Sequence, residues 1–538
     1  MMKVPLNLST MLERAEKLFP KKEVVSRTLT KIHRLTYKEI GERTRRLASV
    51  LVELGVQPGD KVASFAWNQH RHLEAYFAVP GIGAVLHMVN IRLSAEHIIY
   101  IINHAENKVL LIDEDLLPII EKVKDQLTTV KHFILMTDQE ELPESSIQPL
   151  YSYEKLLASG DPTFAFRKDI DEYSPAGMCF TSATTGNPKG VVYTHRALFL
   201  HSMCLGLVDT LALSETDVSM PVVPMFHVNA WGMPYAATWF GAKQVLPGPQ
   251  FTPKILADLI EQEKVTVTAG VPTIWLGLLQ EIEKSNRDMS SLRSVVCGGS
   301  AAPVSLIKAY EEKHKIPFLH AYGMTETTPV VTVSRLKTYQ NDLPLEERML
   351  IRAKQGLLVP GLEMRVVGDQ GDVAWDGKEM GELLLKGPWI ADGYYKDERT
   401  AENFRDGWLH TGDIATVDEE GFVKLVDRTK DLIKSGGEWI SSVDLENALM
   451  AHEAVFEAAV VAVPSEKWDE RPVACVVLKE GFKGKVSEKE LIDFLAPKFA
   501  KWWLPDAVVF MDEIPKTSVG KMLKRALRDQ IRDKVKVG

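Results

Sequence analysis

Cysteine is scarce in this sequence and follows no pairing motif. The 538 residues include only 4 cysteines, Cys179, Cys204, Cys297 and Cys475, which lie in apolar segments without CxxC spacing. So few cysteines are not enough to cross-link a chain of this length, so a secreted fold held by disulfides is excluded. The sequence predicts a reducing compartment, by default the cytoplasm.

Long hydrophobic runs are also lacking. The longest apolar passages, such as residues 76–89, are broken by Pro80, Gly81 and Gly83 and fall short of the ~18 to 20 residues that a membrane span requires. The first 14 residues have no apolar core and contain Glu13, unlike a signal peptide. We therefore expect no transmembrane segment and no secretory signal.

An excess of positive charge is missing as well. The formal net charge is -9, which argues against a general nucleic-acid binder, so an anionic ligand must be held by charge focused in one place. With 45% hydrophobic and 25% charged residues the chain has the composition of a folded globular protein. Its length exceeds what one hydrophobic core usually organises, which predicts two or more domains.

Helix-like and strand-like segments alternate over the first two thirds of the chain. Thr36 begins a helical pattern that is followed by a strand at 61–65, and the strand at 294–297 leads into a glycine-rich turn. This order predicts an α/β fold, in which ligands bind beyond the carboxyl ends of the strands. After Pro360 the sequence becomes rich in strands, and beyond 427–431 it predicts a separate small α+β unit.

Residues 181–190, Thr-Ser-Ala-Thr-Thr-Gly-Asn-Pro-Lys-Gly, form a hydroxyl-rich loop between two apolar runs. Backbone N–H groups and hydroxyls are the donors that phosphates need, glycine permits close approach, and Lys189 adds a charge. The loop is not a Walker A motif, because Lys189 lies three residues beyond Gly186 and is followed by Gly190. We interpret it as a phosphate cradle; the alternative is a polar surface turn.

Three further segments suit a nucleotide. Residues 322–326 offer an aromatic ring, a glycine, a hydroxyl and a carboxylate after a strand, for a base, a phosphate and Mg²⁺, although a helix start is the alternative. Residues 407–413 end in Asp413, which suits ribose hydroxyls unless this is a plain Gly-Asp turn, and Arg428 would reach the same sugar. Lys521 follows Gly520 before a basic helix, where it is a catalytic candidate or a solvated lysine.

The order and spacing of these segments resemble the adenylate-forming superfamily of acyl-CoA synthetases, firefly luciferase and peptide-synthetase adenylation domains. The matching segments are 181–190, 322–326, 407–413, 427–434 and 517–521, within a resemblance that runs from about Thr36 to the C-terminus. The phrases at 224–231 and 500–505 are most similar to bacterial medium- to long-chain fatty acyl-CoA synthetases. The central glycine usual in the cradle is Ala183 here, which narrows the approach to phosphate.

The resemblance implies a domain organisation. Residues 1–429 would form a large N-terminal domain of α/β layers with a β-rich portion, which binds the acid and ATP. Residues 430–538 would form a small mobile α+β domain that acts as a catalytic lid, with its hinge near Lys430.

The resemblance also implies a set of site residues. The ATP phosphates would contact Thr181, Ser182, Thr184, Thr185, Gly186 and Lys189, with Mg²⁺ at Thr181 and Glu326. The rest of the nucleotide would contact Val228, Gly299, Ser300, Ala301, His320, Ala321, Tyr322, Gly323, Thr325, Asp413, Arg428, Lys430 and Lys521. The acyl chain would pass His227 and Trp231, and coenzyme A would face Lys434, Gly436, Gly437 and Trp439. The catalytic residues would be Lys521, Lys189, His227, Thr325 and Glu326. Trp231 is either a moving gate or an ordinary core tryptophan.

The implied reaction converts a medium- or long-chain fatty acid and ATP into acyl-AMP and pyrophosphate, and then transfers the acyl group to coenzyme A. One alternative is a ligase for an aromatic or short-chain acid, and another is an enzyme that transfers the acyl group to a carrier protein. A non-catalytic nucleotide-binding homologue is a further alternative. For soluble enzymes in general a homodimer is common, and on that ground alone we expect one here.

Overall fold

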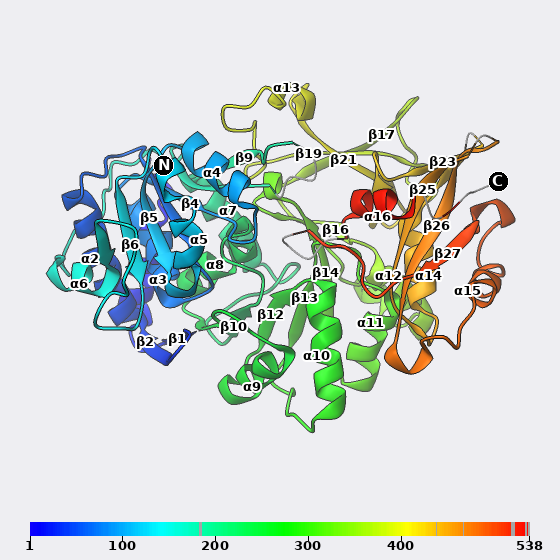
Figure 1. Cartoon of the computed structure of the whole chain (residues 1–538), viewed down its shortest axis with the longest axis horizontal. Coiled ribbons are helices and arrows are strands. Elements are labelled where there is room, and N and C mark those ends of the chain that lie inside the picture. Colours follow the sequence, from blue (N-terminus) through cyan, green and yellow to red (C-terminus); the bar gives the residue numbers. More distant parts are fainter. Residues whose placement is uncertain (182–185, 437, 466, 518–521, 533–534, 536–538) are drawn as a thin grey trace.

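A computed structural model describes the chain except for residues 182–185, 437, 466, 518–521, 533–534 and 536–538. Within the described residues the strands form four sheets. Figure 1 shows two of them side by side in the first half of the chain, a third above them, and a fourth in the C-terminal part. The protein is thus a mixed α/β fold with a large N-terminal portion and a smaller C-terminal one, as predicted.

The seven-stranded sheet lies at the N-terminal side of the molecule (Figure 1). Its strands are parallel except at the β9 edge. In spatial order they are β7 (Leu150–Ser152), β6 (His132–Met136), β5 (Asn107–Asp113), β3 (Lys61–Phe65), β4 (Val85–Met88), β8 (Pro175–Phe180) and β9 (Gly190–Thr194). The loop 181–190 joins β8 to β9, so the sheet positions the expected phosphate cradle.

The nine-stranded sheet has a parallel centre and antiparallel edges. Its order is β16 (Leu357–Leu358), β15 (Val330–Val333), β14 (Phe318–Gly323), β13 (Ser294–Cys297), β12 (Val267–Gly270), β10 (Val218–Pro221), β11 (Lys243–Leu246), β1 (Glu23–Arg27) and β2 (Ile32–Thr36). Strands β12, β13 and β14 therefore end side by side at one edge of the sheet.

Alternating side chains place this sheet between two layers of helices. On β13, Val296 belongs to the core shared with the seven-stranded sheet, whereas Val295 and Cys297 belong to the outer core. Because successive strand residues face opposite sides, one short strand supplies both cores. The shared core contains α1 (Ser9–Leu18), α2 (Tyr37–Glu53), α3 (His70–Gly81), α7 (His195–Leu205) and α8 (Met233–Phe240). The outer core contains α9 (Pro253–Glu263), α10 (Pro272–Lys284), α11 (Val304–Lys308) and α12 (Leu345–Ala353).

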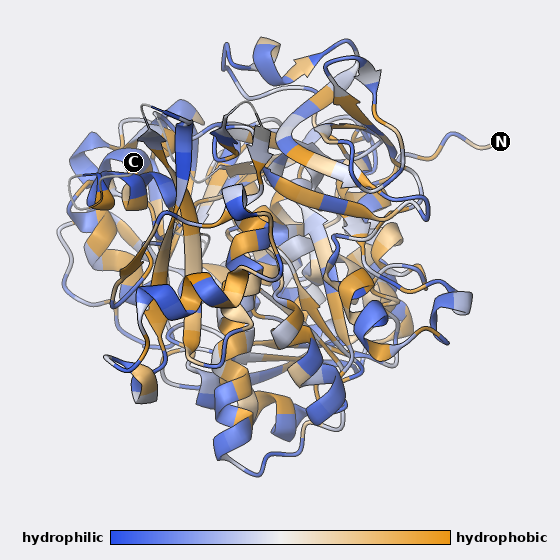
Figure 2. Cartoon of the chain, turned by 90° about the vertical axis from the view of Figure 1, so that its right-hand side faces the viewer, coloured by the Kyte–Doolittle hydropathy of each residue, from blue (hydrophilic) through white to orange (hydrophobic). Residues whose placement is uncertain are grey.

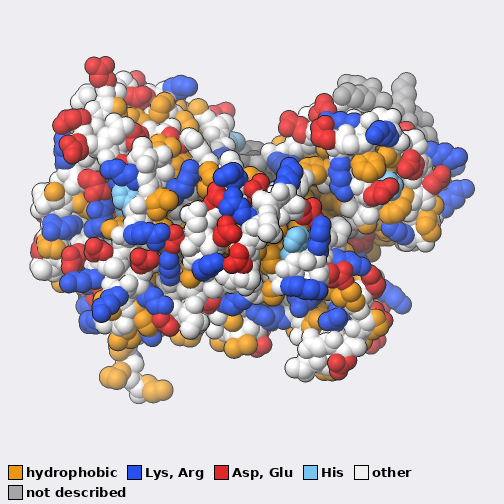
Figure 3. Space-filling model, turned by 90° about the horizontal axis from the view of Figure 1, so that it is seen from below, with side chains coloured by type: hydrophobic (Ala, Val, Ile, Leu, Met, Phe, Trp, Pro, Cys, Tyr) orange, Lys and Arg blue, Asp and Glu red, His pale blue; other side chains and the backbone are white. Residues whose placement is uncertain are grey.

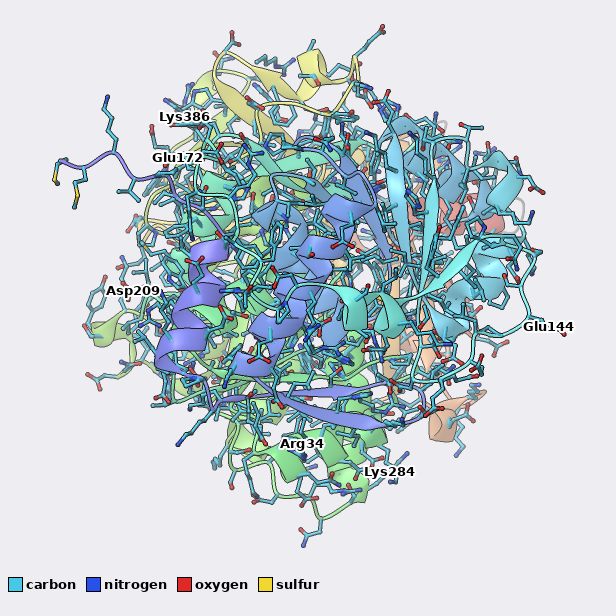
Figure 4. The ribbon with its side chains drawn as sticks, turned by 90° about the vertical axis from the view of Figure 1, so that its left-hand side faces the viewer. Arg34, Glu144, Glu172, Asp209, Lys284 and Lys386 are labelled. Carbon is cyan, nitrogen blue, oxygen red and sulfur yellow. The ribbon has the colours of Figure 1, made fainter. Side chains whose placement is uncertain are left out.

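The N-terminal segment is anchored to this large portion by ion pairs and hydrogen bonds. Glu172 accepts a hydrogen bond from the backbone N–H of Leu6 at 3.1 Å and pairs with Arg196 at 2.5 Å. Figure 4 shows Glu172 where the extended N-terminal residues meet the body. The start of α2 is fixed by a capping box between Thr36 and Glu39, which confirms the helix predicted after Thr36.

The third sheet is antiparallel and accounts for the strand-rich stretch after Pro360. It consists of β18 (Gly371–Asp372), β17 (Glu363–Gly368), β19 (Gly381–Lys386), β21 (Trp408–Val417), β20 (Phe404–Arg405) and β22 (Val423–Arg428). Its register pairs Asp413 on β21 directly with Arg428 on β22. Two residues that the sequence proposed for one sugar are therefore cross-strand neighbours.

The C-terminal sheet has its own two-sided core. It contains β24 (Glu438–Ile440), β23 (Ile433–Ser435), β26 (Asp469–Leu478), β25 (Val455–Ser465) and β27 (Ala507–Phe510). Along β25, Ala458, Val460 and Ala462 face α14 (Ser442–Met450) and α15 (Glu488–Leu495), while Ala459 and Val461 face α16 (Lys524–Ile531). Figure 2 shows these apolar strands behind the more hydrophilic outer surfaces of the helices. Figure 3 shows the C-terminal portion as a smaller lobe, with both signs of charge spread over the visible face.

Several histidines are fully buried in the large portion, and burial keeps them neutral. Burial lowers the pKa of His72 to about 4 and the pKa of His201 to about 3. His72 is satisfied in this state, because its ring contacts the Ser64 hydroxyl at 2.9 Å and the Trp67 carbonyl at 3.0 Å. Protonating these rings in the folded chain is therefore unfavourable.

We expect acid to destabilise the protein through these histidines. Below the ordinary histidine pKa of about 6.5 the unfolded chain takes up protons that the folded chain does not, so stability falls as pH drops from about 6.5 towards 4, by up to about 1.4 kcal/mol per pH unit for each histidine. Replacing His72 by Gln should make this decline shallower, measured as the free energy of unfolding in urea across that range. Identical slopes for His72→Gln and wild type would contradict the assignment.

Candidate active site

A largely apolar cavity lies at the carboxyl ends of β12, β13 and β14. It encloses about 770 Å³ of empty space, including the space at its mouth. Its lining residues are Leu205, Leu211, Val223, Pro224, His227, Val228, Trp231, Val271, Val296, Gly298, Gly299, Ala321, Tyr322, Gly323, Met324, Thr325, Pro329 and Val330. This is the position at which parallel sheets bind ligands, and its apolar lining suits a hydrocarbon chain.

Two glycines allow the walls of this cavity to approach each other. A Cβ atom on Gly298 would lie 2.8 Å from the carbonyl oxygen of Ala321 and 3.1 Å from the indole of Trp231. A Cβ atom on Gly323 would lie 2.0 Å from the carbonyl oxygen of Pro329. Any larger residue at either position would displace backbone, so the glycines set the width of the site.

A polar group closes one end of the cavity. The Tyr322 hydroxyl donates a hydrogen bond to Asp413 Oδ2 at 2.5 Å, and Arg428 Nε lies 2.6 Å from Asp413 Oδ1. Burial and the neighbouring Asp413 carboxylate raise the pKa of Tyr322 well above its ordinary value, so the phenol stays protonated and acts as the donor. Since Asp413 is only 3% exposed, its negative charge is held by these two partners.

A second polar group links the base of the loop 181–190 to Glu326. Lys189 Nζ donates to the Tyr394 hydroxyl at 2.8 Å, and that hydroxyl donates to Glu326 Oε1 at 2.7 Å. Burial lowers the pKa of Lys189, an effect that the Glu326 carboxylate opposes. Thr181 closes the loop at its base, because its N–H donates to the Lys189 carbonyl at 2.9 Å and its hydroxyl accepts from the Lys189 N–H at 3.1 Å.

The structure gathers many of the site residues suggested by the sequence. His227, Val228, Trp231, Gly299, Ala321, Tyr322, Gly323 and Thr325 line the cavity, and Asp413, Arg428, Lys189, Glu326, Thr181 and Gly186 belong to the polar groups or the loop beside it. His320 points elsewhere, since its ring is held by the carbonyls of Ala353 and Lys354 at 3.0 Å. Ser300 and Ala301 follow the cavity residue Gly299 but do not line the cavity. Ser182, Thr184, Thr185, Gly437 and Lys521 lie outside the described residues.

The residues suggested for coenzyme A lie on the C-terminal sheet. Lys434 Nζ lies 5.7 Å from the centre of the Trp439 ring, across the β23–β24 hairpin. Gly436 has a φ of +62° and donates its N–H to the Trp468 carbonyl at 2.8 Å. Their contacts are thus made within the small lobe, while Lys430 lies exposed just before it.

The terminal helix α16 is tied to the chain that leads from β22 into the small lobe. Arg528 lies 2.8 Å from Asp431, and Lys524 lies 2.8 Å from Glu446 and 3.9 Å from Asp427. Because Asp427 precedes Arg428, these contacts bring the start of α16 near the strand that carries Arg428. The helix is also shorter than the predicted 521–536 in its described part.

Sequence analysis missed two tyrosines of the site. Tyr394 bridges Lys189 and Glu326, and Tyr193 donates its hydroxyl to the Thr325 carbonyl at 3.0 Å. The turn-forming Asp392-Gly393 before Tyr394 was the only available signal, and nothing in the sequence marked the strand residue Tyr193.

Comparison with known proteins identifies the family to which this site belongs. The family model described as AMP-binding enzyme matches residues 12–395, and the model of the AMP-binding enzyme C-terminal domain matches residues 444–521. The chain belongs to the AMP-binding enzyme family. Both expectations that came from the motifs, the adenylate-forming family and the fold, are thereby confirmed.

Individual members of the AMP-binding family match over nearly the whole chain. A long-chain-fatty-acid–CoA ligase of Thermus thermophilus is 53% identical over 99% of this chain and 97% of its own. A 3-methylmercaptopropionyl-CoA ligase of Ruegeria lacuscaerulensis is 44% identical over 99% of this chain and 98% of its own. A crystal structure of an anthranilate CoA ligase in complex with anthranoyl-AMP superposes with a TM-score of 0.87, at 25% identity and 98% coverage of both chains.

We expect the Tyr394 hydroxyl to matter for the use of ATP by this AMP-binding enzyme. Tyr394→Phe removes the bridge between Lys189 and Glu326, and the loss of hydrogen bonds to charged groups should lower kcat/KM for ATP by roughly 10- to 100-fold. Initial rates of pyrophosphate release at varied ATP measure this. Tyr395→Phe is the matched control, since Tyr395 contacts Lys396 outside the polar group. Equal rates for the two variants would contradict the role.

Proposed function

We propose that the protein is an ATP-dependent fatty-acid–CoA ligase that activates a medium- or long-chain fatty acid as acyl-AMP and then forms acyl-CoA. The single observation that carries this proposal is the cavity, which is apolar over most of its wall and ends at Tyr322, Thr325 and the Asp413–Arg428 pair. An acyl chain fits the apolar part, and a nucleotide fits the polar end. The family membership supports both steps of the reaction.

In the first step the fatty carboxylate attacks the α-phosphorus of ATP and pyrophosphate leaves. We assign Asp413 to the ribose hydroxyls, because its carboxylate accepts hydrogen bonds and is oriented by Tyr322 and Arg428. Lys189 and the loop 181–190 hold the departing phosphates, and Thr325 contacts the α-phosphate. Lys521 bridges the carboxylate and the α-phosphate. These residues act by position and charge, which is the main protein contribution to phosphoryl-type transfers.

Thr181 and Glu326 would hold Mg²⁺. The Glu326 carboxylate and the Thr181 hydroxyl are the hard oxygen ligands that this ion prefers. In the described part of the chain no group of three or more His, Cys, Asp or Glu could hold a metal, which fits an ion held by one carboxylate together with phosphate oxygens and water. When bound, the ion neutralises charge on the transferring phosphates.

In the second step the thiol of coenzyme A attacks the acyl carbonyl and AMP leaves. We assign residues 1–429 and 430–538 to two domains that rotate about a hinge near Lys430. Rotation withdraws Lys521 and brings the hairpin with Lys434, Gly436, Gly437 and Trp439 to the cavity. The separate core of the C-terminal sheet supports this division, because a lobe with its own core can move as a rigid body.

Other carboxylic acids are the second candidate substrates. The similarity to a 3-methylmercaptopropionyl-CoA ligase and to an anthranilate CoA ligase favours a short or aromatic acid, whereas the extent of the apolar lining favours a longer chain. Transfer to a carrier protein instead of coenzyme A, and a non-catalytic nucleotide-binding role, are the remaining alternatives. Pyrophosphate release across a series of saturated, short and aromatic acids, with coenzyme A or carrier protein as acceptor, separates all of these.

A cytoplasmic location and a homodimer complete the proposal. All four cysteines are buried and free, which supports a reducing compartment. No helix in the described ranges has both the length and the hydropathy needed to cross a bilayer. Met1, Met2 and Val4 are exposed in an extended segment, an apolar arm of the kind that a second copy would cover. Light scattering after gel filtration would measure the oligomeric state.

We expect Lys521→Ala to separate the two half-reactions. Loss of one charge-stabilising group should lower the rate of adenylate formation by about 10² to 10³-fold, while thioester formation from supplied acyl-AMP should stay near the wild-type rate. Pyrophosphate release measures the first step and acyl-CoA formation from acyl-AMP the second.

The neighbouring Lys516→Ala serves as a control, because Lys516 is paired with Glu457 within the small lobe at 2.9 Å. Equal losses in both steps for Lys521→Ala would contradict the division of labour. If oxygen from a labelled acid did not appear in AMP, the reaction itself would be wrong.

A further inference from the structure

The cavity wall contains a short left-handed turn made almost entirely of residues that avoid this conformation. Residues 228–231 have φ values of +48°, +55°, +48° and +57°, and Gly232 follows at +76°. In L-residues the left-handed helix brings Cβ too close to the following carbonyl oxygen, so it normally occurs at single residues. Asn tolerates it and Gly adopts it freely, but Val228, Ala230 and Trp231 do not.

This strained turn carries two residues of the cavity wall. Val228 and Trp231 both line the cavity, and the Trp231 indole lies against the Cα of Gly298. Strain of this kind persists only where surrounding packing holds it, and it gathers at sites that change conformation. The turn is therefore held by its packing near a second, less strained arrangement.

Asn229 adds a second unfavourable feature to the same turn. Its side chain is 0% exposed, and neither its amide nitrogen nor its amide oxygen has a hydrogen-bond partner among the described residues. Buried amides are almost always paired, because leaving one unpaired forfeits its hydration. The left-handed state is thus destabilised by its side chain as well as by its backbone.

Partners for this amide are available close to the turn. The N–H groups of Val228 and Asn229 face the thiol of Cys179, whose pKa burial raises to about 12, so that the sulfur stays neutral. The Tyr235 hydroxyl is also buried and without a partner among the described residues, and it interacts with Cys179. A small change in the turn would let the Asn229 amide pair with groups of this cluster.

We propose that Asn229 is a positioning residue that shifts the turn 228–232 from its left-handed state to a relaxed state with a wider acyl cavity. In the left-handed state Trp231 stays against Gly298 and narrows the cavity. In the relaxed state the Asn229 amide is paired, the positive φ values are released and the indole moves from Gly298. The fatty chain binds the relaxed state and so draws the equilibrium towards it. The inference rests on the proposed function, because it concerns the acyl end of the same site.

Two substitutions that favour the left-handed state provide the test. Asn229→Gly removes the unpaired amide and accepts a positive φ, and Ala230→Gly removes the clashing Cβ while it keeps Asn229. We expect each to raise KM for dodecanoate, by about tenfold for Asn229→Gly, since the hydrogen bond gained on opening is lost. KM for ATP should change less than twofold, a difference that general damage to the fold would not produce. The thermal shift caused by dodecanoate should shrink in parallel and requires no turnover.

Matched controls lie outside the turn. Ala236→Gly makes the same change inside α8, where glycine lowers helix stability, and Ser219→Ala removes another buried hydroxyl without a partner, on β10. Both should keep the wild-type KM for dodecanoate, and Ala230→Gly should melt above Ala236→Gly.

The outcomes distinguish this inference from the proposed function. An active wild type together with unchanged KM values in Asn229→Gly and Ala230→Gly would overturn the inference alone. Equal changes in KM for ATP and dodecanoate would do the same, because they would indicate general damage. A wild type that releases no pyrophosphate with any acid would overturn the proposed function, and the inference with it.

Discussion

The contact between Tyr322 and Asp413 joins the two halves of the candidate site. Tyr322 ends a strand of the nine-stranded sheet, and Asp413 lies on the antiparallel sheet, 91 positions further along the chain. Because Asp413 is buried, its charge requires both the phenol and Arg428, so the sheets cannot separate without leaving a carboxylate unpaired. The position of the polar end of the cavity therefore depends on this one interaction.

The fold and the family could be predicted because their signals are local. Thr36 and Glu39 form a capping box that can be read from four residues, and the α/β order follows from apolar runs that end in glycine or hydroxyl clusters. The alternating valines of β13 and β25 explain why short strands sufficed, since each faces two cores. Asp413 and Arg428 also stand in recognisable motifs, and their sheet register brings them together.

The rest of the site depends on contacts between distant segments, which no local pattern records. Tyr394 is 205 positions from Lys189 and 68 from Glu326, so its bridging role appears only when the antiparallel sheet packs beside the loop. His320 illustrates the converse. Its place in a motif suggested a nucleotide contact, yet the carbonyls of Ala353 and Lys354 fix its ring. The left-handed turn was equally invisible, because Val228, Ala230 and Trp231 give no sequence signal for positive φ.

Rigidity and strain are divided within this site in a way that suits its chemistry. The polar end is rigid, because each buried charge has charged or hydrogen-bonding partners that would lose free energy on moving. The apolar end is bounded by a turn whose backbone and whose Asn229 amide are both unfavourable as they stand. A phosphorus atom under attack demands fixed geometry, whereas acyl chains differ in length and demand a wall that can move. Strain is thus confined to the part of the cavity where the ligand is variable, and the charged groups that would position the nucleotide remain undisturbed.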